Sequence, residues 1–121
     1  MKNLSFARRA THAASGIRHA AQSEASFRTQ LFLAAAALGG CVILRPKPYW
    51  WAALAITLGM VLAAELFNTA LERVMDRLHP ELHPLIKQAK DCASGAVLIL
   101  ALTALAVAAA CLFETCWKGP S

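Results

Sequence analysis

Three apolar runs without a charged residue divide the chain and predict membrane-spanning helices. They extend from Leu31 to Leu44, from Tyr49 to Ala64 and from Ala93 to Phe113. A span usually needs about 17–25 residues, so the first run is short unless it begins near residue 28. We predict spans over about 29–45, 49–72 and 91–114, and we expect the second helix to continue, polar on one face, to about Leu78.

The first 28 residues mix polar and apolar positions and predict a surface helix. Phe6, Ala10, Ala13, Ile17 and Ala21 recur at helical spacing, and arginine and histidine occupy other positions. This pattern is typical of an amphipathic helix lying on a membrane. Because alanine supplies most of the apolar side, an ordinary solvated helix is the alternative.

Prolines and aromatic residues mark the ends of the predicted spans. The segment Arg45-Pro46-Lys47-Pro48 interrupts the helical pattern, and a second break covers His79-Pro80 and His83-Pro84, since proline does not continue a helix interior. Tyr49, Trp50 and Trp51 resemble an interfacial aromatic belt. We therefore predict one all-α integral membrane domain over residues 1–121, with a surface helix at 1–28 and three transmembrane helices.

Composition supports lipid as the solvent. Hydrophobic residues make up 58% of the chain and charged residues 16%, against about 25% charged residues in soluble domains. A soluble chain of this length has too small a core for so much apolar surface. The four cysteines form no C-x-x-C pair, so we expect neither a thiolate metal site nor a disulfide framework.

The chain has a net charge of +5, and the distribution of its basic residues along the sequence predicts an orientation. Basic residues lie between the apolar runs without interleaved aromatics, so we expect anionic lipid rather than nucleic acid as their partner. They are concentrated in the first 30 residues and in the loop before the third span. Only Arg45, Lys47 and Lys118 fall on the opposite side of the predicted membrane. The N-terminus and the loop between the second and third spans are therefore predicted to be cytoplasmic.

One face of the second helix carries the most suggestive chemistry. Glu65, Asn68, Glu72 and Asp76 follow one another at spacings of three, four and four, which places them on one side. Glu65 lies about 24 Å along the helix from Tyr49, near the edge of the hydrocarbon, and Glu72 about 10 Å further. A carboxylate at the boundary can accept a proton from a lipid hydroxyl, and one in water can hold Mg²⁺.

The alternative is that these acids are ordinary residues of a helix end. We favour that interpretation for Asp76 and Glu81. For Glu65 we do not, because an ionisable group beside an apolar span is costly and usually functional. Asn68 alone would more often join helices to one another.

Lys90 and Asp91 precede the third apolar run and allow two interpretations. Asp91 is either an N-terminal cap with Lys90 reaching toward the interface, or the pair binds phosphate, metal or nucleotide. No glycine-rich phosphate loop occurs in the sequence, so a nucleotide pocket would have to be built from helix side chains. Glu24 by itself is a surface acid.

These segments together resemble the prokaryotic diacylglycerol kinases, a family that includes the undecaprenol kinases. The run from Glu65 to Glu72 resembles the signature E-x-x-N-[ST]-A-[IL]-E, and Glu24-Ala25-Ser26-Phe27-Arg28 resembles the element E-x-x-F-R. The similarity extends over about residues 6–113. It implies a homotrimer of three-span chains in the bacterial inner membrane, with active sites shared between subunits at the cytoplasmic boundary.

The resemblance also implies roles. Glu65 would be the catalytic base of a lipid kinase that transfers the γ-phosphate of ATP to a primary hydroxyl. Glu24 and Glu72 would hold Mg²⁺ and contact nucleotide. The other positions implied for nucleotide are His12, Glu81, Leu82, His83, Lys90 and Asp91. Those implied for the lipid are Ser26, Phe27, Arg28, Thr29, Gln30, Asn68 and Ser94.

Departures from the family pattern bear on the substrate and on the nucleotide. The family's N-terminal arginine and tyrosine fall on Ser5 and His12, so Arg8 or Arg9 is the alternative nucleotide contact. Gln30 replaces an acid, and the His83-Pro84 loop looks more like the undecaprenol kinases. We expect diacylglycerol as the lipid, with undecaprenol as the alternative.

A rival from another class is a non-enzymatic helical membrane oligomer. It would use Glu65 only as a polar contact inside the membrane. That role requires neither Glu72 in the aqueous layer nor the Lys90-Asp91 pair.

Overall fold

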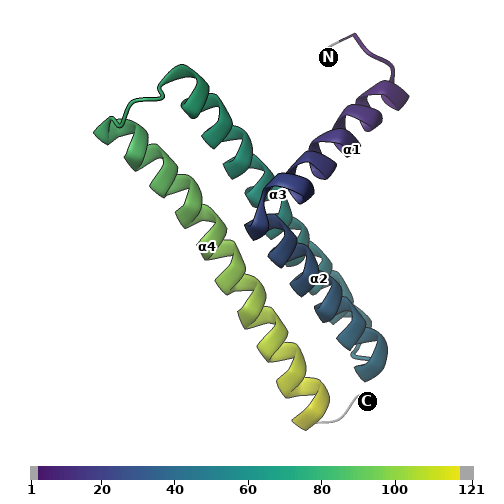
Figure 1. Ribbon diagram of the computed structural model, residues 1–121. Coiled ribbons are helices and arrows are strands. Elements are labelled where there is room, and N and C mark those ends of the chain that lie inside the picture. The colour runs from purple at the N-terminus through teal and green to yellow at the C-terminus, as the bar shows by residue number, and fades with distance from the viewer. Residues whose placement is uncertain (1–2, 118–121) are drawn as a thin grey trace.

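A computed structural model describes residues 3–117, and every regular element in that range is a helix (Figure 1). The order is α1 Phe6–Ser23, α2 Ala25–Leu44, α3 Pro48–Leu78 and α4 Pro84–Leu112, followed by a π-helical turn, Phe113–Trp117. α2, α3 and α4 with its π-helical turn are long and apolar enough to cross a membrane. The prediction of an all-helical chain with three helices able to span a membrane is confirmed.

Proline and histidine fix where α3 and α4 begin. Pro48 and Pro84 occupy the first turn of their helices, where a missing N–H costs nothing. His83 caps α4, since its Nδ1 accepts a hydrogen bond from the Leu85 backbone N–H at 3.1 Å. The interpretation of Asp91 as the N-terminal cap is therefore wrong: Asp91 lies about two turns inside α4. Before α3, Arg45 adopts a left-handed conformation with φ 52°.

The junction between α1 and α2 is a sharp break at Glu24. This residue is extended, with φ −116° and ψ 110°, so the first helix ends at Ser23 rather than at residue 28. Arg28 stabilises the corner because its Nη1 donates to the carbonyl oxygens of Ala21 and Gln22, at 3.0 and 3.1 Å. These carbonyls belong to the last turn of α1, which has no helical partners for them. Residues 25–28 therefore open the first spanning helix.

α3 is the central element of the bundle. It packs along α4 and α2, and α1 touches both α2 and α3 as it leaves the bundle at an angle (Figure 1). Phe27, Leu54 and Val61 are buried, and Phe27 is only 1% exposed. Large apolar side chains such as Phe32 and Phe67 face outward, as helices in lipid require. The N-terminal ends of α1 and α4 lie away from the turn between α2 and α3 (Figure 1).

At the end of the bundle that holds the α2–α3 turn, a carboxylate joins α3 to the π-helical turn. Tyr49 Oη and Trp50 Nε1 both donate to Glu114 Oε2, at 2.5 and 2.6 Å. The belt residues thus also connect two helices. Arg45 and Lys47 belong to this end, whereas Lys118 lies outside the described residues, as does Lys2 among the basic residues of the N-terminal segment.

Replacing Phe27 should destabilise the bundle strongly. Phe27→Ala removes a fully buried ring, a change that typically costs about 3–5 kcal/mol. Thermal unfolding of the purified protein in detergent micelles measures the loss. The matched control is Phe32→Ala on the same helix, whose ring is 72% exposed. Equal melting temperatures for the two variants would contradict the assigned core.

Candidate active site

A groove of about 270 Å³ opens between α2, α3 and α4. Its polar lining comes from residues that the sequence singled out, and its apolar lining comes from α4. The lining residues are Ser26, Gln30, Glu65, Asn68, Ser94, Val97, Leu98 and Ala101. The groove therefore presents polar groups beside apolar surface, as a site for the head of a lipid would.

Glu65 is the acid among the groove's lining residues, and it is buried, with 3% of its surface exposed. Ser26 Oγ donates a hydrogen bond to Glu65 Oε1 at 2.7 Å. A carboxylate removed from water is tolerated only when it is hydrogen-bonded, and Ser26 supplies that bond from the first turn of α2. The break at Glu24 thus brings the two side chains together. The result is a carboxylate held in one orientation at the groove wall.

Asn68 and Glu72 continue the polar face of α3. Asn68 Nδ2 lies 3.4 Å from Glu72 Oε1, to which it donates a long hydrogen bond. Asn68 Oδ1 is buried and has no hydrogen-bond partner among residues 3–117. A buried acceptor without a donor is rare in folded proteins. Asn68 Oδ1 is therefore a buried polar atom near the groove that the described chain leaves without a donor. Because α3 is one unbroken helix, the one-sided register predicted for these residues is confirmed.

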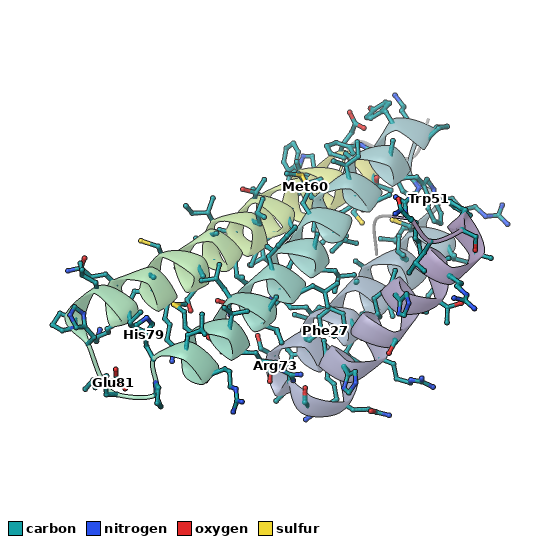
Figure 2. The ribbon with its side chains drawn as sticks, turned by 90° about the horizontal axis from the view of Figure 1, so that it is seen from above. Phe27, Trp51, Met60, Arg73, His79 and Glu81 are labelled. Atoms are coloured by element: carbon teal, nitrogen blue, oxygen red, sulfur yellow. The ribbon has the colours of Figure 1, made fainter. Side chains whose placement is uncertain are left out.

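Glu24 lies at the corner between α1 and α2 and faces Arg73 of α3. Arg73 Nη2 is 3.9 Å from Glu24 Oε2 and also donates to Ser23 Oγ. Figure 2 shows Arg73 beside this corner, near Phe27. The partner of Glu72 is Asn68 rather than Arg73, so the two acids share no partner side chain among residues 3–117. Their convergence on one ion stays a prediction.

The residues of this region fit Mg²⁺ as part of a nucleotide complex. In the described chain, no three His, Cys, Asp or Glu side chains gather as a metal cage. Mg²⁺ rarely uses such a cage and is usually held by one or two carboxylates plus water and phosphate oxygens. Glu72 carries a single long hydrogen bond, so its carboxylate is available as one of those ligands.

Lys90 and Asp91 are adjacent on α4 but have different partners. Lys90 Nζ lies 2.5 Å from Asp76 Oδ1 of α3, and Lys87 Nζ lies 2.8 Å from Asp91 Oδ2 on the same helix. Asp76, which the sequence suggested was an ordinary helix-end residue, is thus the partner of Lys90. This pair could not be predicted from the sequence because it forms across the α3–α4 hairpin.

Most other positions implied for nucleotide lie away from the groove. Glu81 and Leu82 are exposed in the loop between α3 and α4, where His79 Nδ1 is 3.8 Å from Glu81 Oε1 (Figure 2). His12 lines a separate depression on α1 together with Arg18. In a single chain the groove residues therefore lie together, whereas these implied nucleotide positions lie apart from them.

The positions implied for lipid divide into three groups. Ser26, Gln30, Asn68 and Ser94 line the groove. Phe27 is part of the core, and Arg28 caps α1. Thr29 is exposed on α2.

The apolar lining of the groove was not predicted, although its signal is present. Val97, Leu98 and Ala101 follow Ser94 at offsets of three, four and seven. Such offsets define one face of a helix. Once Ser94 is placed in the groove, these three residues follow from helical geometry.

Comparisons with known proteins identify the family of the chain. The family model for prokaryotic diacylglycerol kinase matches residues 11–112. A diacylglycerol kinase of Synechocystis sp. is 38% identical over 97 residues, and one of Sinorhizobium sp. is 39% identical over 77 residues. These matches cover 79% and 64% of this chain, but only 55% and 56% of the relatives.

A third relative has a different name. An undecaprenol kinase of Bacillus subtilis is 34% identical over 91 residues, which are 75% of this chain and 74% of that protein. The structure has three helices that are apolar enough to span a membrane and a polar groove between them. The chain belongs to the prokaryotic diacylglycerol kinase family. It spans about half the length of the first two relatives.

The α1–α2 corner should depend on Arg28. Arg28→Gln removes the two hydrogen bonds to the end of α1, so amide hydrogen exchange at residues 18–24 should become roughly two- to fivefold faster, the effect of an exposed charged contact. Exchange mass spectrometry in micelles measures this, with Arg18→Gln on α1 as the control. Unchanged exchange combined with a raised KM for lipid would instead assign Arg28 to the substrate.

Proposed function

We propose that this protein is an ATP-dependent lipid kinase that phosphorylates the primary hydroxyl of a membrane lipid, converting diacylglycerol to phosphatidate. The observation that carries the proposal is the buried, oriented carboxylate of Glu65 in a groove between three spanning helices. Membership of the prokaryotic diacylglycerol kinase family supports it. A fully structural carboxylate would not need to line an open groove.

The chemistry begins with a lipid hydroxyl in the groove. Glu65 accepts the hydroxyl proton as the hydroxyl oxygen forms a bond to the γ-phosphorus of ATP. The bond from that phosphorus to the bridging oxygen breaks, and ADP leaves with the electron pair. Ser26 keeps Glu65 Oε1 in place through its hydrogen bond. Oε2 is thereby left as the oxygen that takes the proton.

The nucleotide is bound by the polar part of α3 and α4 beyond the groove. Glu24 and Glu72 hold Mg²⁺, which neutralises phosphate charge when bound. Lys90 and Asp91 contact the phosphates, and the loop residues Glu81, Leu82 and His83 contact the rest of the nucleotide. His12 is the corresponding contact from α1, with Arg8 or Arg9 as the alternative.

The assembly is a homotrimer in the bacterial inner membrane. The N-terminus and the α3–α4 loop are cytoplasmic, because most basic residues lie toward these segments. α1 rests on the membrane surface. The groove in one chain is open, and Leu98 at its wall is 58% exposed, which leaves room for a neighbouring subunit to complete the site.

Undecaprenol is the second candidate lipid. Arg28, a possible donor to the ester carbonyls of diacylglycerol, is committed to the end of α1, whereas Asn68 and Ser94 stay in the groove. An undecaprenol has a bare hydroxyl and needs fewer donors. The match to the Bacillus subtilis undecaprenol kinase covers more of that relative than the first two matches cover of theirs.

Replacing Glu65 tests the proposal. Glu65→Gln keeps an oxygen that can accept the Ser26 hydrogen bond, so the bundle should remain folded. The amide does not accept the hydroxyl proton, and loss of a general base typically lowers turnover about 10²–10⁴-fold. Phosphate transfer to lipid in mixed micelles measures the effect.

The matched control is Glu114→Gln, which makes the same replacement at the far end of the bundle and should retain turnover. Near-normal turnover by the Glu65 variant would exclude Glu65 as the base. If the wild-type protein also showed no transfer to any lipid alcohol, the non-enzymatic oligomer would be the better interpretation.

A further inference from the structure

One turn of α3 carries two opposite charges, and each faces a different helix. Arg73 reaches Glu24 at the start of α2, with 3.9 Å between Nη2 and Oε2. Asp76 reaches Lys90 on α4, with 2.5 Å between Oδ1 and Nζ. The two α3 residues are three positions apart and therefore near neighbours on the helix surface. Neither had been assigned a role from the sequence.

Arg73 and Asp76 carry charges of the same sign as the metal and the phosphate that the proposed site would bind. Glu24 is a proposed metal ligand, and Arg73 gives it a positive partner. Lys90 is a proposed phosphate contact, and Asp76 gives it a carboxylate oxygen. We propose that Arg73 and Asp76 are internal substitutes for the metal and the phosphate, which occupy Glu24 and Lys90 until MgATP binds. This inference rests on the proposed function.

The two ion pairs are weak enough to be displaced. The side chains of Arg73 and Asp76 are 50% and 65% exposed, and exposed pairs contribute little to stability because water screens them. A deeply buried pair would resist exchange, since breaking it leaves an unpaired charge out of water. Here both released groups remain in contact with solvent.

The released side chains also have a partner in each other. Arg73 and Asp76 carry opposite charges at i and i+3 of one helix, a spacing at which side chains attract. When Glu24 and Lys90 turn to a ligand, Arg73 and Asp76 can pair along α3. The exchange therefore leaves no charge alone on either side.

Competition by Arg73 and Asp76 should lower the affinity of the empty site for metal and for phosphate. Removing Arg73 takes away the cation that competes for Glu24 and also a positive charge that repels metal. Removing Asp76 takes away the anion that competes for Lys90 and also a negative charge that repels phosphate. In each case both effects have the same sign, so each variant should bind its ligand more tightly.

The first experiment measures binding of Mn²⁺ alone to the nucleotide-free protein by electron paramagnetic resonance. Arg73→Gln should bind Mn²⁺ roughly two- to fivefold more tightly, the range expected for loss of an exposed ion pair. Arg73→Lys keeps the charge and should resemble the wild type. Arg77→Gln removes the same charge one turn along α3. Among the described residues Arg77 forms no ion pair with Glu24, so this control should change Mn²⁺ affinity less than Arg73→Gln.

The second experiment measures binding of metal-free ADP by calorimetry. Asp76→Asn should bind ADP roughly two- to fivefold more tightly than the wild type, and Asp76→Glu should stay close to it. The ADP experiment still tests the inference if Arg73→Gln does not fold. Unchanged or weaker binding in the neutral variants overturns the inference, because weaker binding would show that Arg73 and Asp76 position the site. A wild-type protein that binds neither Mn²⁺ nor ADP overturns the proposed nucleotide site and the inference together.

Discussion

α3 is longer than the hydrocarbon core of a membrane is thick, and the remaining features depend on this excess. Its 31 residues extend about 46 Å, whereas the core of a bilayer is about 30 Å. An unbroken helix can therefore place Glu65 at the boundary and Glu72, Arg73 and Asp76 in the aqueous layer. Helices α1, α2 and α4 all contact α3, so the positions of their polar residues are set relative to it.

A carboxylate near lipid is stable only if the fold provides a donor. Ser26 is that donor for Glu65, and it reaches the groove because the chain breaks at Glu24 and starts α2 one residue later. Arg28 and Arg73 hold the same corner, from α2 and from α3. The corner thus links the surface helix to the groove. A change in the corner would move Ser26 and so alter the orientation of the Glu65 carboxylate.

The spans and the polar face of α3 could be predicted from the sequence, because these follow from composition and helical spacing. Glu65, Asn68 and Glu72 share a face for that reason. The other polar residues of the groove were implied only by the family resemblance, namely Ser26, Gln30 and Ser94. The break at Glu24 could not be predicted, since Arg28 makes it favourable through contacts with the preceding helix.

The start of α4 was placed too late because apolarity begins after Lys90, whereas the helix begins at Pro84 in polar sequence. The pairs Lys90–Asp76 and Tyr49–Glu114 required knowledge of which helix ends meet. The roles of the nucleotide positions are not visible in one chain, and they remain predictions.

The most direct test of the account is transfer of label from ATP carrying a marked γ-phosphate to lipid by the purified wild-type protein. Diacylglycerol and undecaprenol are supplied at equal concentration in one micelle, with Mg²⁺ present. The account predicts labelled phosphatidate as the main product, and a preference for undecaprenyl phosphate would change the lipid but not the roles of Glu65 or Glu72. A folded protein that transfers no label to either lipid would contradict the central claim.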